Sequence, residues 1–415
     1  MAKIFHAHLH GDRDTKYDRL MESDISNTEW SEISPQTPFY LLIPQDTQLL
    51  KEYDQGWKIT EIMPVNSVGI VTARDALTIQ WTEEEIWQTV NDFASLEPER
   101  AREKYNLGDD ARDWKVSMAQ ADLKQSGISK ENLFPILYRP FDTRYTYYTG
   151  NSRGFHCRPR SDVMQHMLAG HNMALVVGRS GAVMGDEKWN IISVSQQIID
   201  FNFYRRGGEQ VHTLYLHSDS KIGSVSRPNL SQSFLNDITT KLGYTPTPEA
   251  IFYYIYAIFH SPTYRSRYAE FLKIDFPRVP LTRNDTLFRQ LAAYGEELVA
   301  LHLMKSAKLT QTHQHPQFVE QGGNCIVDPA HPKYEINTRS VIINKKGDRF
   351  TDIPQAVWNF YVGGYPVCAK WLKDRKGRTL SPQDITHYQQ IVVALDETIK
   401  LMTAIDQAIP GFPIE

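Results

Sequence analysis

The stretch SPQDITHYQQIVVALDETIKLMTAIDQAI, near the end of the chain, constrains the fold more than any other. Ser381 and Asp384 have the spacing of a capping box, and Pro382 suits the first helical turn. Apolar side chains then recur every three or four residues and mark one face of a helix. They are Ile385, Tyr388, Val392, Leu395, Ile399 and Met402. A long helix with one narrow apolar stripe is predicted to pack on its own domain.

The hydrophobic pattern divides the whole sequence into three regions. Together, these regions predict an α+β fold. Residues 1–132 are expected to be mixed, with strands and turns up to about residue 80 and helix from Thr82 to about Ser126. Residues 133–235 read as a β-rich region, and residues 236–415 as a mainly helical region. The candidate strands of the β-rich region are LFPILYRPF, TRYTYYTG, NMALVVGRS, NIISVSQQIID and HTLYLH.

Within the third region, helices are expected at residues 246–273 and 284–306. The first has Pro248 near its start and a break at Ser261-Pro262. The segment RSVIINKKGDRFTDIP suggests a hairpin, and it follows a polar insertion.

Composition excludes several classes of protein. A chain of 415 residues with 41% hydrophobic and 23% charged residues is typical of a globular protein with two or three domains. No apolar run is long enough to span a bilayer, and the first residues do not resemble a signal peptide. Three widely spaced cysteines argue against a disulfide framework and favour a reducing compartment, so we predict a cytoplasmic protein without a membrane partner.

Common catalytic motifs are missing. His6, His8 and His10 would share one face of a strand, but they lack the further ligands that a metal site needs. The stretch VVGRSGAVMGDEKW lacks the Gly-Lys-Ser/Thr end of a phosphate loop, and GRSGA is not a nucleophile elbow. No Gly-x-Gly-x-x-Gly and no Asn-Pro-Pro-aromatic tetrapeptide occurs. We therefore predict no catalytic residue, no metal and no cofactor.

Charge is distributed unevenly along the chain. Residues 1–135 carry 24 acids and 14 bases, whereas residues 138–206 carry 5 acids and 9 bases, eight of them arginine. A local excess of arginine is expected of a phosphate-binding face, and Arg, Gln and Asn also read base edges. The predicted DNA-binding residues are Arg139, Arg144, Arg153, Arg158, Arg160, Arg179, Lys188, Gln196, Gln197, Arg205 and Arg206. A solvated surface that happens to be rich in arginine is the alternative.

The aromatic residues of YRPFDTRYTYYTG, residues 138–150, admit two interpretations. They could stack on bases, or they could alternate into the core of a strand, and we favour the core for most of them. Gly363, Gly364 and Tyr365 are predicted to form a structural turn.

Several stretches resemble the C-terminal specificity region of type ISP restriction-modification enzymes. The matching segments are FHAHLHGDRDTKYDRL, SVGIVTARDALTI, FPILYRPFDTRYTYYTG, PEAIFYYIYAIFHSPTYRSRYAEFLKIDFPRVPLT and VWNFYVGGYPVCAKWLKDRKGRTLSPQDITHYQQIV. The resemblance implies a target-recognition domain that grips double-stranded DNA and reads a short asymmetric sequence. It also implies partner modules, a methyltransferase that methylates adenine and a helicase or nuclease, in the same polypeptide or in a separate subunit.

Because helicase and methyltransferase motifs are absent, the resemblance implies that methylation and cleavage lie outside these residues. Two alternatives remain open at this point. The chain could be an adenine-specific methyltransferase with an unrecognised active site, or a protein-docking subunit of such a system.

Overall fold

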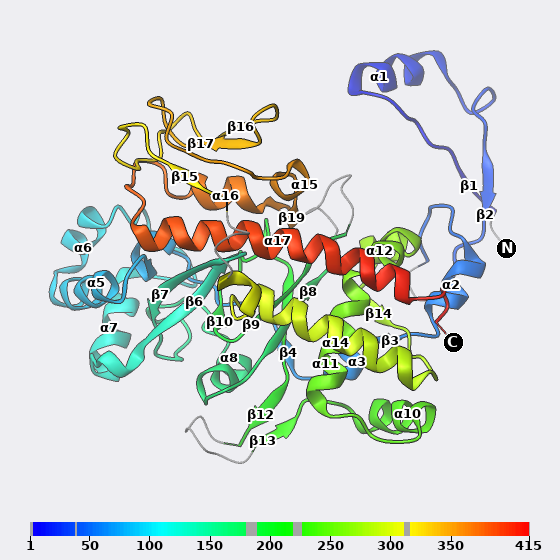
Figure 1. The fold of residues 1–415 in the computed structure, drawn as a ribbon, viewed down its shortest axis with the longest axis horizontal. Coiled ribbons are helices and arrows are strands. Elements are labelled where there is room, and N and C mark those ends of the chain that lie inside the picture. Colours follow the sequence, from blue (N-terminus) through cyan, green and yellow to red (C-terminus); the bar gives the residue numbers. More distant parts are fainter. Residues whose placement is uncertain (1–2, 38–39, 180–188, 219–225, 311–315, 415) are drawn as a thin grey trace. The chain divides into compact units, whose positions relative to one another are not determined.

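The structure is a computed structural model that describes residues 3–37, 40–179, 189–218, 226–310 and 316–414. Contacts divide the chain into two compact units, Met1–Gln55 and Gly56–Glu415. Figure 1 shows helices and several small sheets, so the predicted α+β class is confirmed. The predicted boundaries near residues 132 and 235 stay a prediction. Among the described residues, no helix is long and apolar enough to cross a membrane.

The first unit contains helices that its sequence did not suggest. Strands β1 (Ile4–His6) and β2 (Ser31–Ile33) pair antiparallel. Helices α1 (Arg13–Glu22) and α2 (Thr47–Tyr53) lie where only strands and turns were expected, and that expectation was wrong. The cause is local capping: Asp12 accepts a hydrogen bond from Thr15 N at 2.8 Å, and Asp46 accepts one from Leu49 N at 2.9 Å. The described part of PFYLLIP, residues 40–44, forms no strand.

Two four-stranded sheets form the β-rich part of the second unit. One has the order β10-β6-β7-β5 and the other β4-β11-β8-β9. All pairings in them are antiparallel except the parallel pair β10 and β6. Their strands are β4 (Asn66–Ser67), β5 (Ile79–Gln80), β6 (Leu133–Arg139), β7 (Asp142–Tyr147), β8 (Ala174–Gly178), β9 (Ile192–Ser195), β10 (Ile198–Ile199) and β11 (Glu209–Thr213). Each sheet thus takes one strand from before residue 133, because β4 and β5 pair with later strands.

Helices surround these sheets, and most follow the predicted pattern. Helix α5 (Glu83–Ser95) begins with the predicted capping box of Thr82 and Glu85. Helices α6 (Pro98–Lys104) and α7 (Val116–Ser126) follow it, and their buried faces form one apolar core with α5. Helix α8 (Ser161–Leu168) interrupts the β-rich region and was not predicted. With only 8 residues, it is too short for its apolar residues to show a helical period.

The long C-terminal helix is confirmed as α17 (Pro382–Ala408), with the Ser381–Asp384 capping box present. It packs against α11 (Pro248–His260) and α14 (Asp285–His302), which cross each other closely (Figure 1). Gly295 allows this approach, because a Cβ there would lie 1.9 Å from the carbonyl oxygen of Tyr253. Both helices begin where predicted, at Thr247-Pro248 and after Asn284.

Smaller elements complete the second unit. The predicted hairpin is present as β17 and β18, and the predicted turn at Gly363 and Gly364 joins β19 and β20. These elements are β3 (Trp57–Lys58), α3 (Ile59–Ile62), α4 (Asp75–Thr78), β12 (Tyr215–His217), β13 (Ser226–Pro228), α10 (Gln232–Leu242), α12 (Pro262–Arg267), α13 (Ala269–Ile274), β14 (Arg278–Val279), β15 (Phe318–Val319), β16 (Lys333–Glu335), β17 (Ser340–Ile342), β18 (Arg349–Phe350), α15 (Gln355–Trp358), β19 (Tyr361–Val362), β20 (Tyr365–Pro366) and α16 (Val367–Lys373).

A buried aspartate joins the β-rich part to the C-terminal helices. Asp142, at the start of β7, is 1% exposed and accepts hydrogen bonds from Arg144 Nη2 and Arg375 Nη2, both at 3.0 Å. Arg375 follows α16 and also lies 3.6 Å from Asp384, in the first turn of α17. The guanidinium groups of Arg144 and Arg375 lie 3.8 and 4.9 Å from the centre of the Trp81 ring. One carboxylate thus fixes segments that are more than 200 residues apart in sequence.

Replacing Asp142 with Asn should destabilise the protein strongly. The substitution leaves two buried guanidinium groups without their shared carboxylate, and breaking a buried ion pair typically costs about 3–5 kcal/mol of unfolding free energy. Urea denaturation measures the loss. Asp396→Asn is the control, because Asp396 forms a solvent-exposed pair with Lys400 and such pairs contribute at most about 1 kcal/mol. Equal losses in the two variants would contradict a special role for Asp142.

Candidate nucleic-acid interface

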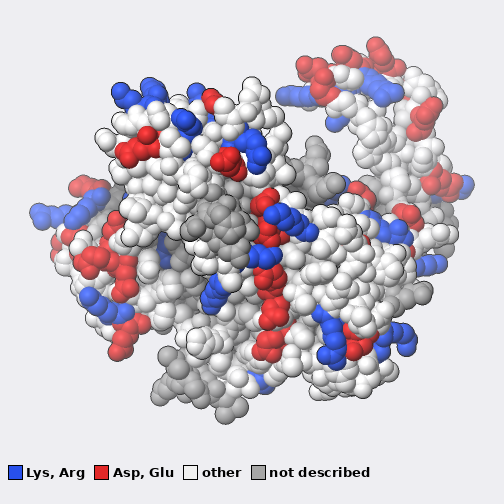
Figure 2. Space-filling view, in the orientation of Figure 1, with Lys and Arg blue, Asp and Glu red and all other residues white. Residues whose placement is uncertain are grey.

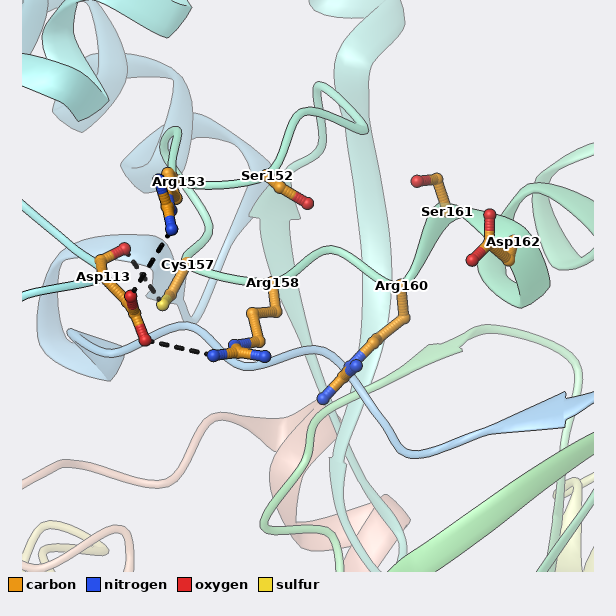
Figure 3. A pocket seen from close by; sticks show the side chains of 8 residues that line it. All are labelled: Asp113, Ser152, Arg153, Cys157, Arg158, Arg160, Ser161 and Asp162. Carbon is orange, nitrogen blue, oxygen red and sulfur yellow. Dashed lines mark hydrogen bonds and ion pairs between the residues drawn. The ribbon is translucent and has the colours of Figure 1, made fainter.

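Three of the predicted arginines converge on one pocket. They come from the loop that joins β7 to α8, residues 148–160, and the pocket has a volume of about 260 Å³ (Figure 3). Its lining residues are Asp113, Ser152, Arg153, Cys157, Arg158, Arg160, Ser161 and Asp162. Two hydroxyl groups and three guanidinium groups in one depression can donate many hydrogen bonds to an anion.

Buried residues anchor the middle of this loop. Phe155, His156 and Cys157 are each at most 6% exposed, and Phe155 belongs to the core between α5 and α7. His156 Nε2 lies 2.9 Å from Thr146 Oγ1, which itself donates to a carbonyl, so the imidazole donates this hydrogen bond. Burial lowers the pKa of His156 to about 4, and its ring is therefore neutral at pH 7. At His156, the loop is consequently tied to the core by uncharged groups.

Asp122, on α7, holds the same loop from the other side. Its carboxylate accepts hydrogen bonds from Thr149 Oγ1, Asn151 Nδ2 and Phe155 N, each at 2.8 Å. Gly154 fits against it, because a Cβ there would lie 2.1 Å from Asp122 Oδ2. Arg158 completes the attachment through a two-way backbone pairing with Val71. These contacts give the arginines a fixed backbone.

Arg153 and Arg158 are the exposed members of the set. Their side chains are 64% and 51% exposed, and both approach the carboxylate of Asp113. Arg158 Nη2 lies 3.1 Å from Asp113 Oδ2, and Arg153 Nη2 lies 3.9 Å from Oδ1. Figure 3 shows both side chains directed at this aspartate. Each guanidinium group therefore has a carboxylate nearby while it remains open to solvent.

Arg160 differs from the other two. Its backbone is left-handed, with φ of 58°, and it is the residue directly before α8. Its Nε atom is buried and has no hydrogen-bond partner among the described residues. Burial lowers the pKa of this guanidinium, and the neighbouring Arg158 lowers it further. The charge of an anionic ligand in the pocket would offset both effects, because it would attract the guanidinium group.

Arg139 and Arg144 lie inside the protein instead. Arg139 is 7% exposed and donates to Asp200 Oδ1 at 2.6 Å. Arg144 is held by Asp142 and packs between the rings of Trp81 and Tyr138. Of the aromatic residues in the same stretch, Tyr147 is fully buried, as expected of a strand that faces the core.

The other predicted residues are dispersed over separate loops. Arg179, which follows β8, is exposed and lies 5.8 Å from the ring of Phe276. Gln196 accepts a hydrogen bond from Lys305, and Gln197 accepts one from Thr143 at 3.0 Å. Arg205 and Arg206 are exposed in a turn. Lys188 lies outside the described residues.

Sequence analysis missed both acidic residues of the pocket, Asp113 and Asp162. Asp113 belongs to the charge-rich segment between α6 and α7, and it is 45 residues away from Arg158 in sequence. Hydrogen bonds from Arg112 and Arg158 lower the pKa of Asp113, so it is ionised at neutral pH. A charge-rich segment gives no sign of which charge it will meet in the fold. The described residues contain no group of His, Cys, Asp and Glu that could hold a metal ion.

Figure 2 shows a different surface, on which acidic side chains form a band over α17 and α14. The acidic residues of these two helices include Asp396 and Glu397 on α17 and Glu296 and Glu297 on α14. Lys308 and Lys400 compensate part of this charge through contacts with Glu397. A band of carboxylates repels phosphates, so this surface is a poor candidate for DNA binding.

Comparison with known families gives one match. The family described as the Type ISP C-terminal specificity domain matches residues 61–404. No curated protein matches the sequence.

Three solved structures have similar folds, at low sequence identity. A cryoEM structure of a DrdV–DNA complex has a TM-score of 0.71 and 19% identity, and the match covers 94% of this chain and 42% of that one. A nuclease-deletion mutant of the Type ISP restriction-modification enzyme LlaGI, in complex with a DNA substrate mimic, has a TM-score of 0.65 and 20% identity, over 97% and 32%. The ATP-dependent Type ISP restriction-modification enzyme LlaBIII bound to DNA has a TM-score of 0.70 and 18% identity, over 100% and 28%. The chain thus corresponds to less than half of each of these proteins.

Replacing Asp122 with Ala should loosen the arginine loop. The buried amide of Phe155 and the hydroxyl of Thr149 would lose their acceptor, which typically costs about 1–3 kcal/mol. Amide hydrogen exchange should accelerate over residues 149–155, as mass spectrometry would measure. Ser126→Ala is the control, because Ser126 makes only peripheral contacts with Asp122 and Asn151. Unchanged exchange in the Asp122 variant would show that the loop is held by other contacts.

Proposed function

Because the chain belongs to the Type ISP C-terminal specificity domain family, we propose that it is a sequence-specific target-recognition module for double-stranded DNA. In this proposal it directs an adenine-specific methyltransferase and a nuclease or translocase that lie outside these residues. The three similar structures support it, since each contains a DrdV or Type ISP protein together with DNA or a DNA mimic.

The observation that carries the proposal is the arginine pocket. Arg153, Arg158 and Arg160 project from a loop whose backbone is fixed, and phosphate contacts from arginine set the register of a protein on a duplex. Arg158 and Arg153 are exposed enough to meet a phosphate without rearrangement of the core. We assign phosphate binding to these three residues.

Base reading is assigned to exposed side chains on the other loops. Arg179, Arg205 and Arg206 are exposed, and arginine can bind the O6 and N7 atoms of guanine with two hydrogen bonds. Gln196 and Gln197 would have to exchange their present partners for an adenine edge. Arg139 and Arg144 act indirectly, because they position β6 and β7 through internal carboxylates.

Selection of bound sequences from a random duplex pool tests the function directly. The purified chain should enrich a short asymmetric motif, because a specificity module reads bases as well as phosphates. Each mismatch in the motif should cost about 1–3 kcal/mol of binding free energy. Retention of duplexes without any enriched motif would reject sequence-specific recognition.

Replacing Arg153 and Arg158 with Ala should weaken binding to duplexes of every sequence. The loss of phosphate contacts should also reduce the slope of log affinity against log salt by about 0.9 for each lost contact. Fluorescence anisotropy over a series of salt concentrations gives both quantities. Arg289→Ala serves as the control, since Arg289 is an exposed arginine on α14 outside the pocket. If the double variant and the control behave alike, the pocket is not the DNA-binding face.

A further inference from the structure

One carboxylate in the arginine pocket faces three guanidinium groups. Asp113 contacts Arg158 at 3.1 Å, its neighbour Arg112 at 3.3 Å and Arg153 at 3.9 Å. A single negative charge thus partly neutralises three positive charges, so the cluster keeps a net positive charge. The side chain of Asp113 is 23% exposed, and those of its partners are 51–89% exposed.

The backbone of Asp113 is held in place by contacts other than its ion pairs. Ala111 and Trp114 exchange backbone hydrogen bonds at 2.9 and 3.3 Å, and the turn between them presents Arg112 and Asp113. Trp114 is fully buried and donates from Nε1 to the carbonyl of Phe155 at 3.3 Å. Cys157 Sγ also lies 3.3 Å from the carbonyl oxygen of Asp113. Two rigid segments therefore place the carboxylate next to the arginines, and its position does not depend on the ion pairs alone.

These ion pairs are of the kind that a phosphate can replace. Contacts between exposed charged side chains are weak, because water solvates the separated partners well. A guanidinium group donates hydrogen bonds to a carboxylate or to a phosphate in the same geometry. A DNA phosphate that approaches Arg158 or Arg153 therefore either displaces Asp113 or binds beside it and is repelled.

We propose that Asp113 competes with DNA phosphates for Arg153 and Arg158, and so limits how tightly this face binds DNA of any sequence. The inference rests on the proposed function. Binding to non-target DNA comes almost entirely from phosphate contacts, whereas target DNA adds base contacts. A carboxylate that weakens only the phosphate contribution makes base contacts a larger share of the total. Asp113 is thus a specificity-determining residue that touches no base.

Asp113→Asn tests this inference on the whole chain, with a labelled duplex of random sequence as the probe. Removal of one charge at contact distance should tighten binding about five-fold at low salt. The salt slope should steepen by up to about 0.9, because one more positive charge becomes available to phosphate. Asp109→Asn is the matched control, since it changes the net charge equally on an exposed residue outside the pocket.

Asp113→Glu separates charge from loop structure. It keeps the carboxylate and should bind the duplex as the wild type does. If it binds as tightly as Asp113→Asn, the effect comes from the backbone and the inference is wrong. Asp113→Ser provides a second neutral variant should the Asn variant fold poorly, and thermal melting identifies that case.

The outcomes distinguish this inference from the function on which it rests. If the arginine double variant loses affinity but Asp113→Asn binds no tighter than the wild type, competition by Asp113 is rejected and the DNA-binding face stands. If neither the arginine variant nor Asp113→Asn alters DNA affinity, both assignments for this pocket fail. Tighter binding by Asp109→Asn to the same degree would attribute the effect to net charge and would also overturn the inference.

Discussion

The ion-pair group around Asp142 is the interaction on which the second unit depends. Its carboxylate binds Arg144 on β7 and Arg375 after α16, and Arg375 reaches the first turn of α17. The β-rich part and the long C-terminal helix are therefore joined by charges that have little access to water. Such a contact is costly to break, because each partner would be left buried without compensation. It explains why Arg144, which looked available for DNA, lies inside the protein, whereas Arg139 is held there by Asp200.

The arginine loop follows from the same strand. Strand β7 begins at Asp142 and ends at Tyr147, and the chain then runs directly into residues 148–160. Asp122 and the buried Phe155 hold that loop, while Arg153 and Arg158 extend outward. A fixed loop lowers the conformational entropy that a ligand must remove on binding. In the proposed function, the scaffold would thereby prepare the guanidinium groups for a phosphate before DNA arrives, while Asp113 contacts two of them.

Helices with strong local signals could be predicted from sequence. The capping boxes at Thr82 and Ser381, and the apolar stripe of α17, are short-range patterns that do not need the rest of the fold. Helices α1 and α8 could not be predicted, since α1 buries no side chain and α8 is too short to show a period. The strands of the β-rich region were located, but their pairing with β4 and β5 depends on contacts over long sequence separations.

The sequence alone determined the family, the class of fold and the concentration of arginine in one region, because these are properties of residue identity and local order. Tertiary structure decided which arginines are open to a ligand. Arg144 and Arg158 are the same residue type in the same region, yet one is 12% exposed beside Asp142 and the other is 51% exposed beside Asp113. Burial and the nearest carboxylate separate them, and both are set by segments distant in sequence, which no local pattern can encode.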